Sequence, residues 1–309
     1  VSSCFLVFFS VSLIACFSSF VTFSRSSRER AGAVCVVVWA GTSQAAYQSS
    51  YDAINFKPAV DATDYYTVYG SQTFKPWQGN LGFYLDYASR PLEFRGTGGT
   101  TGRQSVLDAT AVADLYGAMG LANWFELGVN VPFVAYNWFY TPDVNADKDF
   151  GSGMGDLMVV TKFRFVDIDK HKIGFALAPY ATFPTGDVVR YNGTGHIMVG
   201  GTLIVDFRPV KRFSASLNAG YLMRDDTTTN YVFPGGATSS IFMDDLFKFG
   251  AAMNYRFTQN FQGIIEAQGS TLASDFFQTS NTTSFEAGGG LRYYLGDTGL
   301  SFDAGGTMG

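Results

Sequence analysis

From about residue 74 to its end, the chain is built of segments in which apolar and polar residues alternate. The segment FELGVNVPF at 125–133, for example, places an apolar side chain at every second position. A period of two is typical of β-strands with one apolar face. It predicts eleven strands, near residues 74–88, 105–119, 123–137, 154–167, 171–183, 196–208, 212–224, 243–257, 260–273, 283–295 and 299–306.

The connections between these strands alternate in length. The short ones are 120–123, 167–170, 209–211, 258–260 and 296–298, and the long ones are about 89–104, 138–153, 184–195, 225–242 and 274–282. Tight periplasmic turns alternating with longer outer loops are typical of transmembrane barrels. We therefore predict an all-β fold, a transmembrane antiparallel up-and-down β-barrel over 74–309. Because bacterial barrels have even strand numbers, eleven strands of a probable twelve are expected here, with a truncated C-terminus.

The two faces of the predicted strands differ in polarity. A barrel of this size encloses more space than inward apolar side chains would fill, so the apolar face is expected to meet lipid. Closure would satisfy the backbone hydrogen bonds that lipid cannot. The polar face then lines a lumen, whose charges form either a dense plugging network or the wall of a water path. The predicted lumen-lining charges are Glu126, Asp156, Lys162, Arg164, Lys248, Arg256, Glu266, Glu286 and Arg292.

Several inward positions of the predicted strands are glycines, which favour some open volume in the lumen. They are Gly82, Gly128, Gly200, Gly220 and Gly288.

Aromatic residues gather near the predicted strand ends. Two girdles of Trp, Tyr and Phe are expected at the two membrane interfaces of such a barrel. The predicted interface aromatics are Trp77, Tyr87, Trp124, Tyr136, Trp138 and Tyr221.

Composition agrees with this picture. Only 15% of the 309 residues are charged while 47% are hydrophobic, a balance that excludes a disordered chain. From residue 46 onward no apolar run is long enough for a membrane-spanning helix. We expect outer-membrane lipid and lipopolysaccharide as partners, no nucleic acid and no cofactor, and a location in the Gram-negative outer membrane.

Residues 1–45 differ from the rest. We predict an apolar leader and signal peptide, because Arg-containing residues 25–30 precede a short apolar run and the small-residue context Ser43-Gln44-Ala45. The earlier apolar run, 1–23, is either an added membrane helix or translation from too early a start, and Cys16 lies in a lipoprotein-like context. Residues 46–73 are predicted to be an irregular periplasmic lead-in, with a short strand at 65–69.

Candidate chemistry is sparse. His171 and His196 are expected at opposite barrel ends, so they cannot share a metal ion or a catalytic role, and we predict no enzyme. An outer-membrane hydrolase using His196 is the remaining enzymatic alternative. One outer loop offers alternating oxygen ligands that suit calcium weakly, although it lacks the EF-hand Gly and Glu: Asp143, Asn145, Asp147 and Asp149.

Several short sequence motifs resemble those of known protein families. The segment 150–164, with GSGMGDL and a later KFR, is similar to a strand of the N-terminal barrels of deltaproteobacterial OmpA-family proteins and of the phenol-degradation meta-pathway barrels. FPTGD at 183–187, WFELGV at 124–129 and the lead-in 53–69 extend the resemblance. It implies an OmpA-like barrel, structural or weakly pore-forming, or alternatively a passive channel for small hydrophobic or aromatic solutes. A peptidoglycan-binding domain would lie outside this sequence, so peptidoglycan is expected as a partner only through that domain.

Overall fold

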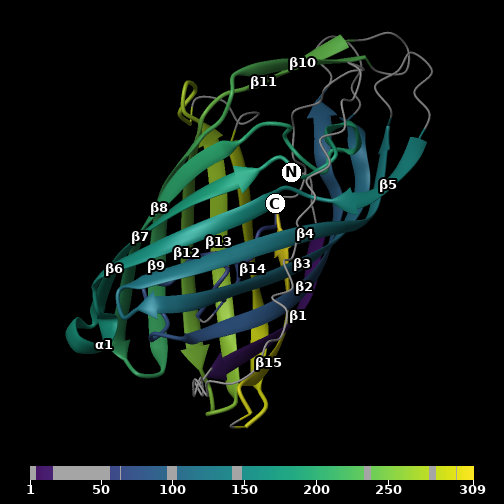
Figure 1. The fold of residues 1–309 in the computed structure, drawn as a ribbon. Coiled ribbons are helices and arrows are strands. Elements are labelled where there is room, and N and C mark those ends of the chain that lie inside the picture. The colour runs from purple at the N-terminus through teal and green to yellow at the C-terminus, as the bar shows by residue number, and fades with distance from the viewer. Residues whose placement is uncertain are drawn as a thin grey trace, which may run out of the picture.

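The strands of the computed structural model close into a ring (Figure 1). The structure describes residues 5–16, 56–62, 64–95, 103–140, 148–232, 238–277, 283–296 and 298–309. Its strands are β1 (Phe5–Cys16), β2 (Gln78–Arg95), β3 (Arg103–Ala122), β4 (Phe125–Tyr140), β5 (Lys148–Met154), β6 (Leu157–Val166), β7 (Ile173–Phe183), β8 (Met198–Val210), β9 (Phe213–Met223), β10 (Thr227–Val232), β11 (Thr238–Met243), β12 (Leu246–Arg256), β13 (Phe261–Leu272), β14 (Thr283–Tyr294) and β15 (Leu300–Met308).

Twelve of the described strands make the closed ring, and every neighbouring pair is antiparallel. The order runs β4, β3, β2, β1, β15, β14, β13, β12, β9, β8, β7 and β6, and β6 pairs with β4 again. β5 pairs with the far part of β4, beyond β6, while β10 and β11 form a separate hairpin. The all-β antiparallel barrel is thus confirmed.

All eleven predicted strands are present, with ends shifted by a few residues. The structure adds β1, which pairs with β2 on one side and β15 on the other, in the position expected of a twelfth strand. It also adds β5, β10 and β11, which lie in predicted long loops. The remainder of the predicted leader, and its cleavage, lie outside the described residues.

The connections alternate as predicted. The short helix α1 (Ile168–His171) lies at the short-turn end, and the β10–β11 hairpin lies at the opposite, long-loop end (Figure 1). The long connection after β7 contains a 3-10 turn, η1 (Val188–Arg190). No helix among the described residues is long and apolar enough to cross a bilayer.

The outer surface of the ring is apolar. Along β2, Phe83, Leu85 and Tyr87 are exposed, whereas Tyr84 and Asp86 between them are buried. The same alternation exposes large apolar side chains on most other strands, such as Leu217 on β9. This band of apolar side chains is what a bilayer requires of the outside of a barrel.

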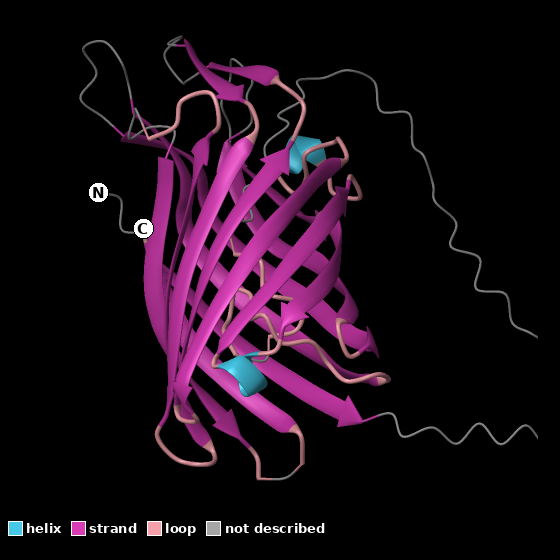
Figure 2. Ribbon diagram, turned by 90° about the vertical axis from the view of Figure 1, so that its left-hand side faces the viewer, coloured by secondary structure: helices cyan, strands magenta, loops and turns pink. Residues whose placement is uncertain are grey.

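The predicted periplasmic lead-in is wrong in its position. Residues 56–62 and 64–74, here called the luminal segment, pass through the inside of the ring (Figure 2). The short strand predicted at 65–69 does not form; that stretch is irregular. Inside the ring there is no free strand edge to pair with, so its backbone groups bond to side chains of the wall instead.

Candidate functional site

Wall side chains hold the backbone of the luminal segment. The Glu266 carboxylate on β13 accepts hydrogen bonds from the amides of Tyr66 and Thr67 and from the Thr67 hydroxyl, the last at 2.6 Å. The Asn218 side chain on β9 accepts from the Tyr69 amide at 2.8 Å and donates to the Tyr69 carbonyl at 3.0 Å. Buried backbone groups need such partners, and here the wall supplies them.

The same pattern continues around the ring. The Asp206 carboxylate on β8 accepts from the Ser71 amide at 2.5 Å. The amide of Phe74 donates to Glu126 on β4 at 2.9 Å. The luminal segment is therefore fixed by bonds from four different strands.

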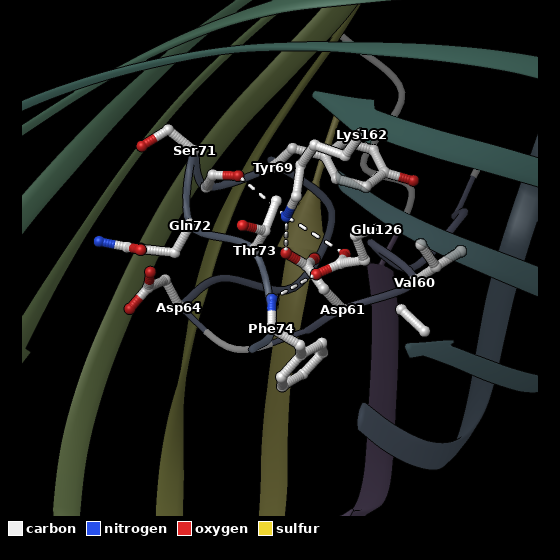
Figure 3. A network of polar contacts seen from close by, with 12 residues as sticks. Val60, Asp61, Asp64, Tyr69, Ser71, Gln72, Thr73, Phe74, Glu126 and Lys162 are labelled. Carbon is white, nitrogen blue, oxygen red and sulfur yellow. Dashed lines mark hydrogen bonds and ion pairs between the residues drawn. The ribbon is translucent and has the colours of Figure 1, made fainter. Parts of the chain in front are cut away.

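A buried ion triad adds charge to these contacts (Figure 3). The Lys162 ammonium on β6 pairs with Asp61 of the luminal segment and with Glu126, whose Oε1 lies 3.4 Å from it. It also donates to the Gly70 carbonyl at 3.3 Å. All three charged side chains are nearly inaccessible to solvent. Breaking such a pair leaves an uncompensated buried charge, so the triad locks the segment to the wall.

A second buried ion pair lies between β14 and β15. The Arg292 guanidinium bonds to both carboxylate oxygens of Asp303, with Nε at 2.6 Å from Oδ1. Its positive charge lies over the Tyr66 ring, 5.6 Å from the centroid. The Asp303 carboxylate also accepts from the Tyr84 hydroxyl at 3.2 Å. This pair therefore contacts aromatic residues of both the segment and the wall.

Two stacked tyrosines, Tyr84 and Tyr116, form what we call the aromatic shelf. Their centroids are 5.1 Å apart with an interplanar angle of 23°. Tyr116 lies over Gly82, where any Cβ would collide with its ring. Phe56 of the luminal segment meets Tyr84 edge-on, with centroids 5.4 Å apart. All three rings are buried.

Three of the five inward glycines do not leave the open volume that was expected of them. The space at Gly82 holds the Tyr116 ring, the space at Gly128 holds Val60, and the space at Gly200 holds Tyr180. Glycine at these positions lets rings and the luminal segment lie close against the wall.

The lumen is also occupied near the long-loop end. Asp156, between β5 and β6, accepts from the Gly186 amide at 3.0 Å and from the Thr194 amide at 2.8 Å. The loop after β7 is thereby drawn inward, and its Tyr191 and Asn192 are buried. The predicted lumen charge Asp156 therefore holds a loop rather than the luminal segment.

The remaining predicted lumen charges are more scattered. Arg164 donates to Gln72 of the luminal segment at 2.7 Å. Lys248 lies over the Tyr180 ring, 5.8 Å from its centroid. Glu286 is partly buried and bonds to Gln268. Arg256 is exposed near the short-turn end, over the Tyr294 ring. The nine charges thus do not form a single site.

Four of the predicted interface aromatics lie near strand ends, namely Trp77, Trp124, Trp138 and Tyr221, whereas Tyr87 lies in the middle of β2. Those well exposed are Trp77, Tyr87, Trp124 and Tyr221. Tyr136 and Trp138 are partly buried because both contact Phe150 of β5, with Trp138 stacked on it at 5.8 Å. Their role at a membrane interface stays a prediction.

The two histidines are far apart, as expected. His171 lies in α1 at the short-turn end, and His196 follows the inward loop, with Nδ1 3.1 Å from an Asp225 carboxylate oxygen. Among the described residues, no group of three or more His, Cys, Asp or Glu could hold a metal ion.

Of the weak calcium candidates, only Asp149 is described. It is exposed and accepts from the Phe150 amide at 2.8 Å. The other three candidates lie outside the described residues: Asp143, Asn145 and Asp147.

Two carboxyl groups in the long connection between β9 and β12 have shifted pKa values. A hydrogen bond from Ser274 lowers the pKa of Asp244 below its ordinary value. Its neighbour Asp226 has a raised pKa, because of partial desolvation and the nearby negative charge of Asp244.

Several functional residues were missed from the sequence. Asp206 and Asp303 occupy inward positions of their strands, so the alternation alone could have placed them in the lumen. Asp61 lies in an aperiodic segment, and no sequence signal links it to Lys162.

Comparison with known proteins settles the family. The model of the family described as "Putative MetA-pathway of phenol degradation" matches residues 85–308. The chain belongs to this family. The match supports the phenol-degradation part of the predicted resemblance, whereas nothing found supports the OmpA-family part. No curated protein matches the sequence.

Solved structures similar to this phenol-degradation family member are outer-membrane barrels. The porin NanC has 11% identity and a TM-score of 0.40, covering 65% of this chain and 93% of its own. The toluene transporter TodX of Pseudomonas putida has 8% sequence identity and a TM-score of 0.38. The match covers 76% of this chain and 78% of TodX. The monoaromatic hydrocarbon channel CymD has 9% sequence identity and a TM-score of 0.37. The match covers 100% of this chain and 88% of CymD.

A closed antiparallel ring with an apolar outer band and a polar interior suits only one environment. This member of the phenol-degradation family is a barrel protein of the Gram-negative outer membrane.

Proposed function

We propose that the protein is a passive channel for small hydrophobic or aromatic solutes, and that the luminal segment is its plug. The single observation that carries this proposal is the occupancy of the lumen by a separate stretch of chain. A barrel serving only as a rigid anchor needs no removable filling, because inward wall side chains can pack its interior.

The contacts of the luminal segment suit a plug. Its backbone is held by wall side chains rather than by a strand ladder, so it can leave the lumen without opening the ring. After the luminal segment leaves, the side chains of Glu266, Asn218 and Asp206 can form hydrogen bonds with water instead.

The solute class is supported by the family and by the lumen lining. The family description names phenol degradation, which requires entry of aromatic compounds. Inside the ring, the aromatic shelf and the rings of Tyr65 and Tyr66 give apolar surface beside hydrogen-bonding groups. Such a mixed lining is typical of sites for small, largely apolar ligands.

An uptake experiment tests the function. Cells that express the folded barrel should take up p-cresol several-fold faster than cells with an empty vector, while glucose uptake stays unchanged. Equal acceleration of both solutes would indicate an unselective pore. Unchanged p-cresol uptake, with the barrel shown to be folded by its heat-modifiable gel mobility, would refute the channel.

A further inference from the structure

We propose that the aromatic shelf is the luminal binding subsite for the ring of an aromatic solute, and that Phe56 occupies this subsite in the structure as a stand-in for the solute. The proposal rests on the proposed channel function and adds a site and a competitor to it.

The geometry at Phe56 is that of a bound ring. Its centroid lies 5.4 Å from that of Tyr84, at an interplanar angle of 69°. Tyr66 approaches Tyr84 in a similar edge-on manner, 6.5 Å away at 89°. Edge-to-face contacts at these separations are the favoured arrangement of aromatic pairs. Phe56 is 1% exposed, so its ring is fully enclosed by this arrangement.

The shelf itself is built into the wall. Tyr84 and Tyr116 belong to neighbouring strands, and the missing side chain of Gly82 lets the Tyr116 ring lie flat. The Tyr84 hydroxyl is tied to Asp303, which is in turn fixed by Arg292. These contacts hold the shelf in place independently of Phe56, so it persists when the luminal segment leaves.

Polar acceptors lie beside the shelf on the same inner face. Asp86 is two residues beyond Tyr84 on β2, and Asn130 is paired with Tyr116 across β3 and β4. Both are buried, and one side-chain oxygen of each, Oδ1, has no hydrogen-bond partner. An aromatic ring that carries a hydrogen-bond donor can donate to an oxygen of this kind, which a phenylalanine ring cannot do.

Occupancy by Phe56 makes the plug and the solute competitors. A solute binds only the fraction of molecules whose shelf is vacant, which lowers its apparent affinity by that fraction. Removing the Phe56 ring should therefore strengthen binding of an aromatic probe.

The test is calorimetric titration of the full chain in detergent with p-cresol and with its saturated counterpart, 4-methylcyclohexanol. Phe56→Ala should bind p-cresol about tenfold more tightly than the wild type, as expected when a competing ring contact is removed. The gain should be lost in Phe56→Ala/Tyr116→Leu and should be small for 4-methylcyclohexanol.

A cavity control separates this subsite from any new void, since apolar cavities can bind aromatic molecules unspecifically. Ile204→Ala removes an equally buried apolar side chain from a different core cluster, and it should leave p-cresol affinity unchanged. Gel mobility confirms that each variant is folded.

Three results would overturn the inference: no gain in folded Phe56→Ala, an equal gain in Ile204→Ala, or a gain that survives Tyr116→Leu. If any of these results is obtained while cells still take up p-cresol, the proposed channel function is retained and only the subsite is rejected. Absent uptake in every folded variant would instead remove the channel function itself.

Discussion

Replacing Lys162 by methionine should release the luminal segment from the wall. The methionine keeps much of the apolar stem of lysine but removes the ammonium group that joins Asp61 to Glu126. Both carboxylates would then be buried without a cation, at a site where all three side chains are at most 3% exposed.

The expected size of the effect follows from that burial. Removing one partner of a buried ion pair costs about 3–5 kcal/mol. When the segment leaves, Asp61 is carried out of the lumen and the repulsion between the two carboxylates is relieved. Most of this free-energy cost therefore falls on the plugged state and shifts the equilibrium toward the open one. Since about 1.4 kcal/mol is a factor of ten in an equilibrium, even the lower figure shifts the plugged-to-open ratio roughly a hundredfold.

Two assays measure this shift. In planar bilayers, open events should be at least about tenfold more frequent for Lys162→Met than for the wild type. In a background with Cys4, Cys16 and Cys35 changed to serine, a cysteine at position 60 should react faster with a membrane-impermeant maleimide.

Matched variants make the result specific. Lys248→Met removes another wall lysine, which contacts the Tyr180 ring, and should leave both readouts unchanged. Adding Asp61→Asn and Glu126→Gln to Lys162→Met should restore much of the plugging, because the buried charges are gone. Equal conductance and labelling in Lys162→Met and the wild type would refute the role of the triad.

Three further predictions concern the wall and one outer loop. Arg292→Met should lower barrel stability by about 3–5 kcal/mol, seen as a lower temperature of heat modification, because its buried carboxylate partner loses its cation. Leu217→Arg should cost about 2–4 kcal/mol of stability in lipid, whereas Trp124→Arg near a strand end should cost at most about 1 kcal/mol in a chemical denaturation titration. Ser274→Ala should raise the pKa of Asp244 toward its ordinary value, because the hydrogen bond that stabilises the carboxylate is removed; an unchanged carboxyl titration by NMR would contradict this.

Much of the barrel could be predicted from the sequence because alternation reports directly which face of a strand each side chain occupies. Glu126, Lys162, Glu266 and Arg292 are all inside the ring for this reason. The luminal segment could not be placed in this way, because it has no period. Its backbone bonds to residues up to 200 positions away, as between Tyr66 and Glu266.

The inward glycines show a second limit. Their spacing indicated space in the lumen, but only the structure shows what fills it. At Gly82 the occupant is a ring of the neighbouring strand, and at Gly128 it is a residue of the luminal segment. A missing side chain is therefore equally compatible with an open path and with a close contact.

The bonding of the luminal segment also constrains the order of assembly. Residues 66 and 67 are synthesised well before β13, yet their amides find partners only on Glu266. Contacts of such large sequence separation form late, because the intervening chain must first be ordered. These two amides therefore gain their partners only after β13 has joined the wall, which ties the placing of the segment to a late stage of folding.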